Sequence, residues 1–545
     1  MSMNNQGRPT GIQNSDSAVP QTVTGNRGLQ IEEPLIFEQD SAGRCGVDLP
    51  EVPAVGSRLG AVKPRGRIGL PGLAEPQVVR HYTRLSQKNY AIDSGLYPLG
   101  SCTMKHNPRL NEKMARLPGF ADVHPLQPES TVQGALELMA ELGRWLATLT
   151  GMAAVTLAPA AGAHGEMCGI MAIRSAHDAK GDKGRTKILV PESAHGTNPA
   201  TAAACGYAVE AIPATEDGRV DLEALKAKLG PDVAGLMLTN PNTCGLFERD
   251  IITIAEAVHA AGAYFYCDGA NFNAIVGRVR PADLGIDVMH INLHKTFSTP
   301  HGGGGPGSGP VVFAESLAPY VPVPYVVQDK DGAFRLVEQA GDGPAFGRMK
   351  AFHGQMGMFV RALAYMMSHG ADGLRQVAND AVLNANYLLA RLQDVMTPSF
   401  EGPCMHECLF DDRFLKGTGV TTLDIAKALI DEGFHPMTMY FPLVVHGALL
   451  IEPTETESKA SLDQFVTALR ALAERAKSGD VAYFQGAPRL TPRRCSLAHD
   501  AAPGDSSSSP PSGHGAGPVP IRQRPSRLNA LAQAGLRTAV RRRER

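Results

Sequence analysis

The fold is decided by two segments, Ala263-Tyr-Phe-Tyr-Cys-Asp-Gly-Ala-Asn271 and Val288-Met-His-Ile-Asn-Leu-His-Lys-Thr296. Each begins with an apolar run of the length of a buried strand and ends in polar residues. We expect neighbouring parallel strands, and the carboxyl ends of such strands meet at one edge of a sheet, where ligands bind. Asp268 and Lys295 would therefore lie close together at that edge.

The same alternation of strands and helices extends on both sides of these segments. Apolar runs bounded by turn residues predict further strands at 187–191, 233–238 and 309–313. Helical patterns predict helices at 166–179, 221–229 and 251–261, and Gly262 is placed to end the last of them. The succession predicts an α/β domain with a mostly parallel sheet.

From about Lys350 the pattern changes to a long helical region over 351–392, followed by strand-like pieces near 404–410 and 441–451. We interpret this part as a smaller C-terminal α+β domain. The predicted organisation is a disordered leader (1–30), an N-terminal arm (31–125), a large α/β domain (126–345), a small domain (346–485) and a low-complexity Arg/Pro/Ser tail (486–545).

The 545-residue chain is nearly neutral, with a formal net charge of -2 and 43% hydrophobic residues. This balance argues against a protein held to nucleic acid by a general positive field. No stretch reaches about 18 consecutive apolar residues and the amino terminus lacks targeting features, so we expect no membrane contact and a cytoplasmic location. The nine scattered cysteines do not form a disulfide framework, which favours reduced thiols.

The tail at 486–545 carries 11 Arg, no Lys and 3 acidic residues among many Pro and Ser residues. A basic tail could contact nucleic acid or an acidic partner, but this composition more often marks a solvated appendage. We therefore expect a solvated appendage.

Asp268 and Lys295 are the pair of side chains that a pyridoxal phosphate site needs. Lys295 would form the Schiff base, and Asp268 would keep the pyridine nitrogen protonated so that the ring can act as an electron sink. The alternative is a surface lysine and an aspartate that opens a turn, because structural ion pairs are common.

Three further features favour a cofactor site. The loop Ala160-Ala-Gly-Ala-His-Gly-Glu166 leads into a helix whose first N–H groups suit a phosphate. His195 follows the predicted strand at 187–191, and it could stack on the cofactor ring or be a capping or core histidine. The glycine run at 301–309 lacks the strand-to-helix context of a dinucleotide fingerprint, so we expect a flexible loop that approaches a ligand.

Two other clusters have simpler interpretations. Cys404, His406 and Cys408 would share one face of an extended segment, but they lack a fourth ligand, and we predict no metal. The segment Glu452-Pro-Thr-Glu-Thr-Glu457 follows a predicted strand, and we expect it to be a solvated turn.

Several motifs in one order resemble a known family. They are Tyr97-Pro-Leu-Gly-Ser-Cys-Thr-Met-Lys105, Pro159-Ala-Ala-Gly-Ala-His-Gly-Glu166, Ser193-Ala-His-Gly-Thr-Asn-Pro-Ala-Thr201, Leu238-Thr-Asn-Pro-Asn-Thr243, Asp268-Gly-Ala-Asn271, Asn292-Leu-His-Lys-Thr-Phe297 and Ile451-Glu-Pro-Thr-Glu-Thr-Glu457. They are similar to the pyridoxal-phosphate glycine dehydrogenase (decarboxylating), the P-protein of the glycine cleavage system. Over residues 33–494 the chain resembles the second, cofactor-carrying subunit of the two-subunit form. The resemblance stops at Cys495, and we hypothesise that a change of reading frame created the tail.

The resemblance implies a fold-type I, aspartate-aminotransferase-like architecture. It implies Lys295 as the catalytic Schiff-base lysine, Asp268 at the pyridine nitrogen and His195 as a catalytic residue on the ring face. The other residues that we expect at the cofactor are Gly162, Ala163, His164, His294, Thr296 and Asn271.

The resemblance also implies an activity and its partners. Glycine would be decarboxylated with pyridoxal 5'-phosphate, and the aminomethyl group would pass to the lipoyl arm of the H-protein. The implied assembly is a heterotetramer with two copies each of this chain and of glycine dehydrogenase subunit 1.

Two alternatives remain open from the sequence. Another fold-type I enzyme, such as a serine hydroxymethyltransferase or an amino-acid decarboxylase, would share the Asp and Lys pair but would need no lipoyl acceptor. A non-catalytic subunit that supports a partner's site would have no use for a Schiff-base lysine.

Overall fold

The computed structural model describes residues 33–41, 43–46, 50, 60–63, 69–302, 307–341 and 343–489. The predicted leader lies outside the described residues, as do the tail from residue 490 onward and residues 303–306 of the glycine run. All elements described below belong to one compact unit, which ends at Pro492.

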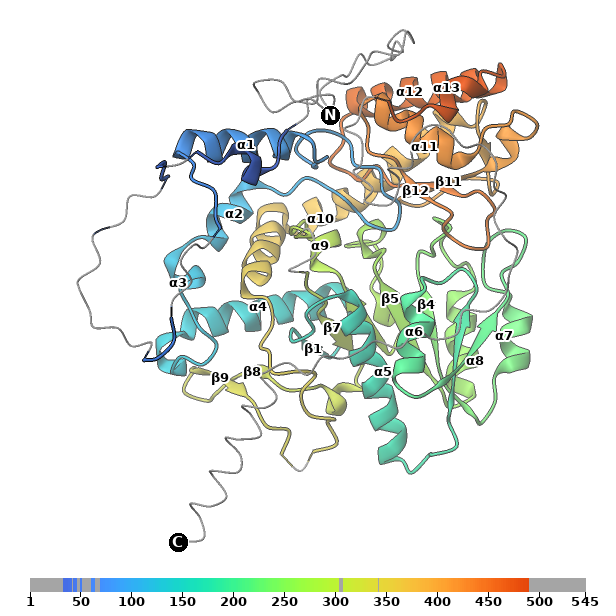
Figure 1. Cartoon of the computed structure of the whole chain (residues 1–545). Coiled ribbons are helices and arrows are strands. Elements are labelled where there is room, and N and C mark those ends of the chain that lie inside the picture. Colours follow the sequence, from blue (N-terminus) through green and yellow to red (C-terminus); the bar gives the residue numbers. More distant parts are fainter. Residues whose placement is uncertain are drawn as a thin grey trace. The chain divides into compact units, whose positions relative to one another are not determined.

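A seven-stranded sheet with the order β1-β7-β6-β5-β4-β2-β3 forms the centre of this unit (Figure 1). Neighbouring strands are parallel, except that β7 runs antiparallel to both β1 and β6. The strands are β1 (Ala154–Thr156), β2 (Lys187–Pro191), β3 (Ala208–Ile212), β4 (Val233–Thr239), β5 (Tyr264–Gly269), β6 (Val288–Ile291) and β7 (Val311–Phe313). The predicted mostly parallel α/β sheet is confirmed.

The helices between these strands are α5 (Gly162–Ala179), α6 (Thr197–Ala204), α7 (Leu222–Lys228) and α8 (Ile251–Ala260). Helix α5 begins earlier than the predicted residue 166. Its first glycines are predicted as loop residues, but Gly165 packs closely within the helix, since an added Cβ there would lie 2.8 Å from the carbonyl oxygen of Gly309. After α8, Gly262 has φ +73°, the left-handed conformation of a helix-ending glycine.

Side chains of the central strands alternate between two cores. On one face, Phe265 of β5 packs with residues of α8 and of α4 (Gln133–Thr150). On the other face, Tyr264 and Tyr266 pack with α5. Because side chains on a strand alternate with a period of two, Asp268 belongs to the face of Tyr264 and Tyr266. The carboxylate therefore points to the side of the sheet that α5 covers.

A long helix, α10 (Met356–Leu392), joins this sheet to a second, four-stranded antiparallel sheet with the order β10-β11-β13-β12. The helix is interrupted at Gly370 (φ 62°, ψ -173°), where an ordinary residue would be strained. The remaining C-terminal elements are β10 (Thr397–Pro398), β11 (Cys408–Asp411), α11 (Thr422–Asp431), β12 (Thr438–Met439), β13 (Leu449–Ile451), α12 (Lys459–Lys477) and α13 (Val481–Gln485). The predicted domain boundaries stay predictions.

Other short elements complete the unit. They are α1 (Glu75–Gln87), α2 (Arg109–Ala115), α3 (Pro118–Ala121), α9 (Leu293–Thr296), the hairpin of β8 (Tyr325–Gln328) and β9 (Phe334–Val337), and the 3-10 turns η2 (Ile36–Gln39), η3 (Glu129–Thr131), η4 (Phe272–Ala274), η5 (Pro281–Leu284), η6 (Ala318–Tyr320) and η7 (Asp412–Leu415). In the part of the chain that the structure describes, no helix is long and apolar enough to cross a membrane.

Two expectations about strand ends need correction. The strand predicted over 288–293 ends at Ile291, because Leu293 already begins helix α9. Strand β11 begins at Cys408, so Cys404 and His406 lie in the preceding loop and do not share a strand face with it.

The strand that carries Asp268 should depend on its buried core side chain. Replacing Phe265, which is 0% exposed, with alanine should lower the free energy of unfolding by about 3–5 kcal/mol, because it leaves a cavity. The matched change Phe37→Ala removes a ring that is 62% exposed and should change stability by about 0.5 kcal/mol or less. Denaturant unfolding of both variants measures the difference, and equal effects would contradict this core.

Candidate active site

A cavity lies at the carboxyl ends of β5 and β6 and contains most of the side chains predicted for the site. Its wall includes Lys295, Asp268, His195, Gly162, Ala163, His294 and Asn271. His164 and Thr296 do not line it. A second cavity near Leu136 and Phe359 is largely apolar and has no lysine among its described lining residues.

Asp268 is a buried carboxylate with a fixed orientation. Its Oδ2 accepts a hydrogen bond from Nδ2 of Asn198 at 3.0 Å, and its Oδ1 accepts one from the Ala270 N–H at 2.9 Å. Nε2 of His290 lies 3.5 Å from Oδ1. Burial raises the pKa of Asp268, but His290, Asn198 and Ala270 together lower it by more. The pKa therefore lies below its ordinary value, and Asp268 is ionised at neutral pH.

Glu166 lies beside Asp268, but its pKa is shifted in the opposite direction. Its Oε1 accepts from the Thr197 hydroxyl at 2.6 Å, and its Oε2 accepts from Nδ2 of Asn198 at 2.9 Å. Burial, followed by the charge of Asp268, raises the pKa of Glu166. The pKa of Glu166 is thus raised and that of Asp268 lowered, which favours the negative charge on Asp268.

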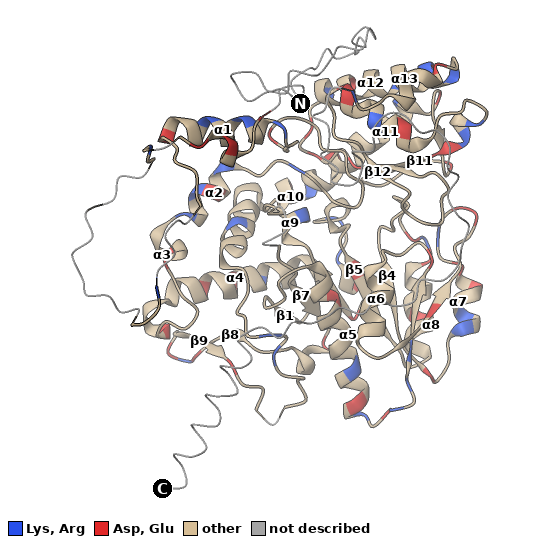
Figure 2. Ribbon diagram, in the orientation of Figure 1, with Lys and Arg blue, Asp and Glu red and all other residues tan. Residues whose placement is uncertain are grey.

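Lys295 lies on α9, just beyond the end of β6. Its Nζ donates a hydrogen bond to the carbonyl oxygen of Ser101 at 2.7 Å, and both residues line the cavity. In Figure 2 a short blue stretch lies at the label of α9, whose one lysine is Lys295. The amine is therefore held at the cavity wall, with the Asp268 carboxylate in the same cavity.

The N-terminus of α5 forms another part of the wall, with Gly162 and Ala163. The first N–H groups of a helix have no partner within the helix, and the helix dipole favours an anion there. An added Cβ on Gly162 would lie 2.4 Å from Nδ2 of Asn292, and one on Gly309 would lie 2.2 Å from the Ala161 carbonyl oxygen. The helix can approach the cavity so closely only because these residues are glycine.

His195 lies at the cavity and is not a core histidine. The ring is exposed at the cavity and lies edge-on to Phe441, with the ring centres 5.6 Å apart. Its Nδ1 accepts the N–H of Thr197, the first residue of α6, at 3.2 Å. His195 thus caps a helix while it faces the cavity.

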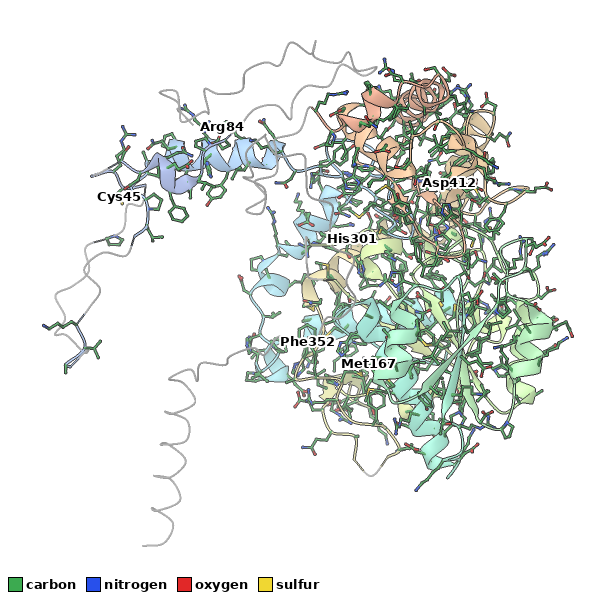
Figure 3. The ribbon with its side chains drawn as sticks, turned by 45° about the vertical axis from the view of Figure 1, so that its right-hand side comes forward. Cys45, Arg84, Met167, His301, Phe352 and Asp412 are labelled. Atoms are coloured by element: carbon green, nitrogen blue, oxygen red, sulfur yellow. The ribbon has the colours of Figure 1, made fainter. Side chains whose placement is uncertain are left out.

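The other predicted residues differ in their surroundings. The His294 ring packs edge-on against His301, which is labelled in Figure 3, and burial lowers the pKa of His294 to about 3. His164 instead accepts the Ala160 N–H at 3.0 Å, within its own loop. Thr296 is fully buried, and its carbonyl oxygen accepts from Nζ of Lys105 at 2.8 Å.

Sequence patterns did not single out several residues that complete the site. Asn198 bridges the two carboxyl groups, His290 faces Asp268, and Ser101 accepts from Lys295. Asn198 and Ser101 lie within motifs that carried the family resemblance, so their position was the available signal. His290 lies within a buried strand and offered none.

The residues present fit pyridoxal phosphate. An ionised carboxylate suits the pyridine nitrogen, an amine suits the aldehyde carbon, and a helix N-terminus suits the phosphate. Thr239 Oγ1 and Asn271 Oδ1 are buried in residues that line the cavity and have no hydrogen-bond partner among the described residues. These atoms are free to bind a polar ligand.

The turn expected to be solvated at 452–457 is buried in its first half, and Thr456 alone is exposed. Glu452 and Thr454 are both 0% exposed, and Oε2 of Glu452 accepts the Thr103 N–H at 2.8 Å. The expectation was wrong because carboxylates after a strand usually face water, whereas this one is covered by a loop that lies far away in the sequence.

Comparisons with known proteins agree with this fold. Residues 377–484 match the glycine dehydrogenase C-terminal domain family, and residues 166–304 match the aminotransferase class-V family. The crystal structure of glycine decarboxylase (P-protein) of the glycine cleavage system in inhibitor-bound form has a TM-score of 0.62 at 23% identity, covering 76% of this chain and 93% of that chain. The predicted fold class is confirmed.

Two curated relatives have a much higher sequence identity to this chain than that structure has. The chain is 69% identical over 499 residues to "Probable glycine dehydrogenase (decarboxylating) subunit 2" of Caulobacter vibrioides, covering 90% of this chain and 95% of the relative. It is 53% identical over 453 residues to the protein of the same name from Chlorobium chlorochromatii, covering 82% and 93%.

The bridge made by Asn198 can be tested through cofactor binding. Asn198→Asp replaces the shared donor with an acceptor between two buried carboxyl groups, so affinity for pyridoxal phosphate should fall about 10-fold or more. Absorbance titration of the cofactor-free protein measures it. The control Asn379→Asp adds a carboxylate next to Arg278, whose Nε lies 2.7 Å from Oδ1 of Asn379, and should not change affinity. Unchanged binding by Asn198→Asp would refute the role of the bridge.

Proposed function

The chain belongs to the glycine dehydrogenase (decarboxylating) subunit 2 family, and on this premise we propose that Lys295, Asp268 and His195 carry its reaction. The enzyme is a pyridoxal-phosphate-dependent glycine dehydrogenase that decarboxylates glycine. One observation supports the residue assignment above all others. An amine, an ionised carboxylate and a helix N-terminus line a single cavity at the carboxyl ends of neighbouring parallel strands.

Pyridoxal phosphate, when bound, supplies an electron sink for the electron pair that remains on the α-carbon of glycine when the carboxylate leaves as carbon dioxide. Asp268 would hold a proton at the pyridine nitrogen, because its carboxylate stays ionised beside His290. Lys295 would provide the amine that binds the aldehyde carbon. His195 would lie against the ring, oriented by its hydrogen bond from the Thr197 N–H.

The phosphate would bind at the N-terminus of α5, where Gly162 and Ala163 line the cavity. Burial and the charge of Asp268 both raise the pKa of Glu166, whereas the pKa of Asp268 lies below its ordinary value. The lower pKa favours the negative charge on Asp268, where a protonated pyridine nitrogen needs it.

The acceptor in this proposal is the lipoyl disulfide of the H-protein. The α-carbon of glycine forms a bond to one sulfur, the disulfide bond breaks, and the other sulfur takes the electron pair and a proton to become a thiol. Glycine thereby loses its carboxylate as carbon dioxide, and the disulfide is reduced. The family name includes a subunit number, so a partner subunit belongs to the enzyme.

We propose a heterotetramer of two copies of each subunit. The N-terminal part of the chain offers apolar side chains to a partner. Among its described residues up to the end of α1, six large apolar side chains are more than half exposed, namely Leu35, Phe37, Val62, Leu70, Val79 and Tyr82. Large exposed apolar areas are typical of interaction sites. Seven described cysteines, from Cys102 to Cys408, are free thiols, which fits the reducing cytoplasm that we propose as the location.

The proposed reaction is tested by the exchange of labelled bicarbonate into the carboxyl group of glycine. The chain would be combined with subunit 1 and with lipoylated H-protein. Lys295→Ala should lower the exchange rate by about 10³-fold or more, because it removes the covalent catalytic group. The control Lys226→Ala, on an exposed turn of α7, should leave the rate unchanged.

Two results would contradict the proposal. Full exchange by Lys295→Ala would show that another residue carries the reaction. Equal exchange with and without the H-protein would favour a different fold-type I enzyme, which has no need of a lipoyl acceptor.

A further inference from the structure

A loop from a distant part of the sequence, residues 101–107, lies against the turn that carries Lys295. Three of its hydrogen bonds reach this turn. Lys295 Nζ donates to the Ser101 carbonyl at 2.7 Å, Lys105 Nζ donates to the Thr296 carbonyl at 2.8 Å, and Asn107 Nδ2 donates to the Ser298 carbonyl at 2.9 Å. The position of the lysine amine therefore depends on the 101–107 loop.

The backbone of this loop has an unusual conformation. Ser101 has φ 59° and Thr103 has φ 48°, both in the left-handed region that residues other than glycine rarely adopt. Such a conformation persists only when the surroundings hold it. The direction of the Ser101 carbonyl thus requires partners outside the loop.

Two buried carboxyl groups are these partners. Glu407 Oε2 accepts the Ser101 N–H at 2.7 Å, and Glu452 Oε2 accepts the Thr103 N–H at 2.8 Å. Both glutamates are 0% exposed. Glu407 immediately precedes β11 and Glu452 immediately follows β13. Because Cys408 pairs with Ile451 in the antiparallel ladder, the two glutamates lie side by side.

Two neighbouring carboxyl groups without exposure to water are costly to a protein. Burial raises the pKa of Glu452 to about 7 and that of Glu407 well above its ordinary value, while the charge of Lys295 lowers both. The two carboxyl groups offset part of this cost by accepting the N–H groups of Ser101 and Thr103.

We propose that Glu407 and Glu452 are positioning residues for Lys295. By holding the backbone of the 101–107 loop, they direct the Ser101 carbonyl at the lysine amine. Whenever this amine is free, the carbonyl keeps it at the cavity wall, ready to react. This inference rests on the proposed function, because it concerns the amine that carries the proposed reaction.

The test measures the reactivity of Lys295 in the cofactor-free chain. Trace acetylation with acetic anhydride, followed by mass spectrometry, gives the labelling rate of Lys295 relative to Lys226 of the same molecule. In Glu407→Leu and in Glu452→Leu, the loop loses its acceptor and the hydrogen bond from Lys295 to the Ser101 carbonyl is lost with it. The labelling ratio should therefore rise about fivefold or more. Glu407→Gln and Glu452→Gln retain an acceptor oxygen and should stay within about twofold of the unmodified chain.

Two further variants separate this effect from damage to the fold. Ser101→Pro removes the N–H that Glu407 accepts and forbids a positive φ, so it should raise the ratio as the leucine variants do, even if these fail to fold. Glu248→Leu is the matched control. Glu248 is also a buried glutamate that accepts a backbone N–H, that of Val220 at 3.1 Å, yet it has no hydrogen bond to the 101–107 loop.

Unchanged Lys295 labelling in Ser101→Pro and in the folded leucine variants would overturn the proposal. An equal rise in Glu248→Leu would overturn it too, because the effect would then be global. Failure of this proposal and failure of the proposed function can be told apart, because the labelling experiment requires neither glycine nor the cofactor. A chain that shows the contrast but does not decarboxylate glycine would refute the function alone.

Discussion

Parallel pairing between β5 and β6 sets Asp268 opposite His290 and leaves α9, with Lys295, directly beyond the end of the neighbouring strand. The rest of the site is arranged around this pairing. Helix α5 covers the face to which Asp268 points, and its N-terminus reaches the same edge of the sheet. A shift of one residue in the register would turn the carboxylate to the other core.

Buried carboxyl groups lie on two sides of the site, and they have a different role on each side. On the α5 side, Asn198 donates to both Glu166 and Asp268, and the pKa of Glu166 is raised while that of Asp268 is lowered. On the C-terminal side, Glu407 and Glu452 hold a loop backbone rather than a ligand. In both places, hydrogen bonds from fixed donors offset part of the free-energy cost of burying the carboxyl groups.

Sequence patterns predicted the parts that local physics determines. Strands β2 and β4 are continuous apolar runs, because residues on both faces of the central sheet are buried, and their predicted bounds agree closely with the structure. Strand β3 was not predicted, because it lies at the edge of the sheet and several of its side chains are exposed. The same patterns placed Asp268 and Lys295 at one edge, since strand ends can be read from the sequence.

Contacts between distant segments could not be read in this way. Thr103 and Glu452 are 349 residues apart, and no local pattern tells a buried strand-end glutamate from a solvated one. For the same reason the sequence did not predict that the Ser101 carbonyl accepts a hydrogen bond from Lys295. Borohydride reduction of the purified protein with pyridoxal phosphate, followed by peptide mapping, shows whether Lys295 is the amine that binds the cofactor. We expect a reduced pyridoxyl group on Lys295, and modification of another lysine, or of none, would refute this assignment.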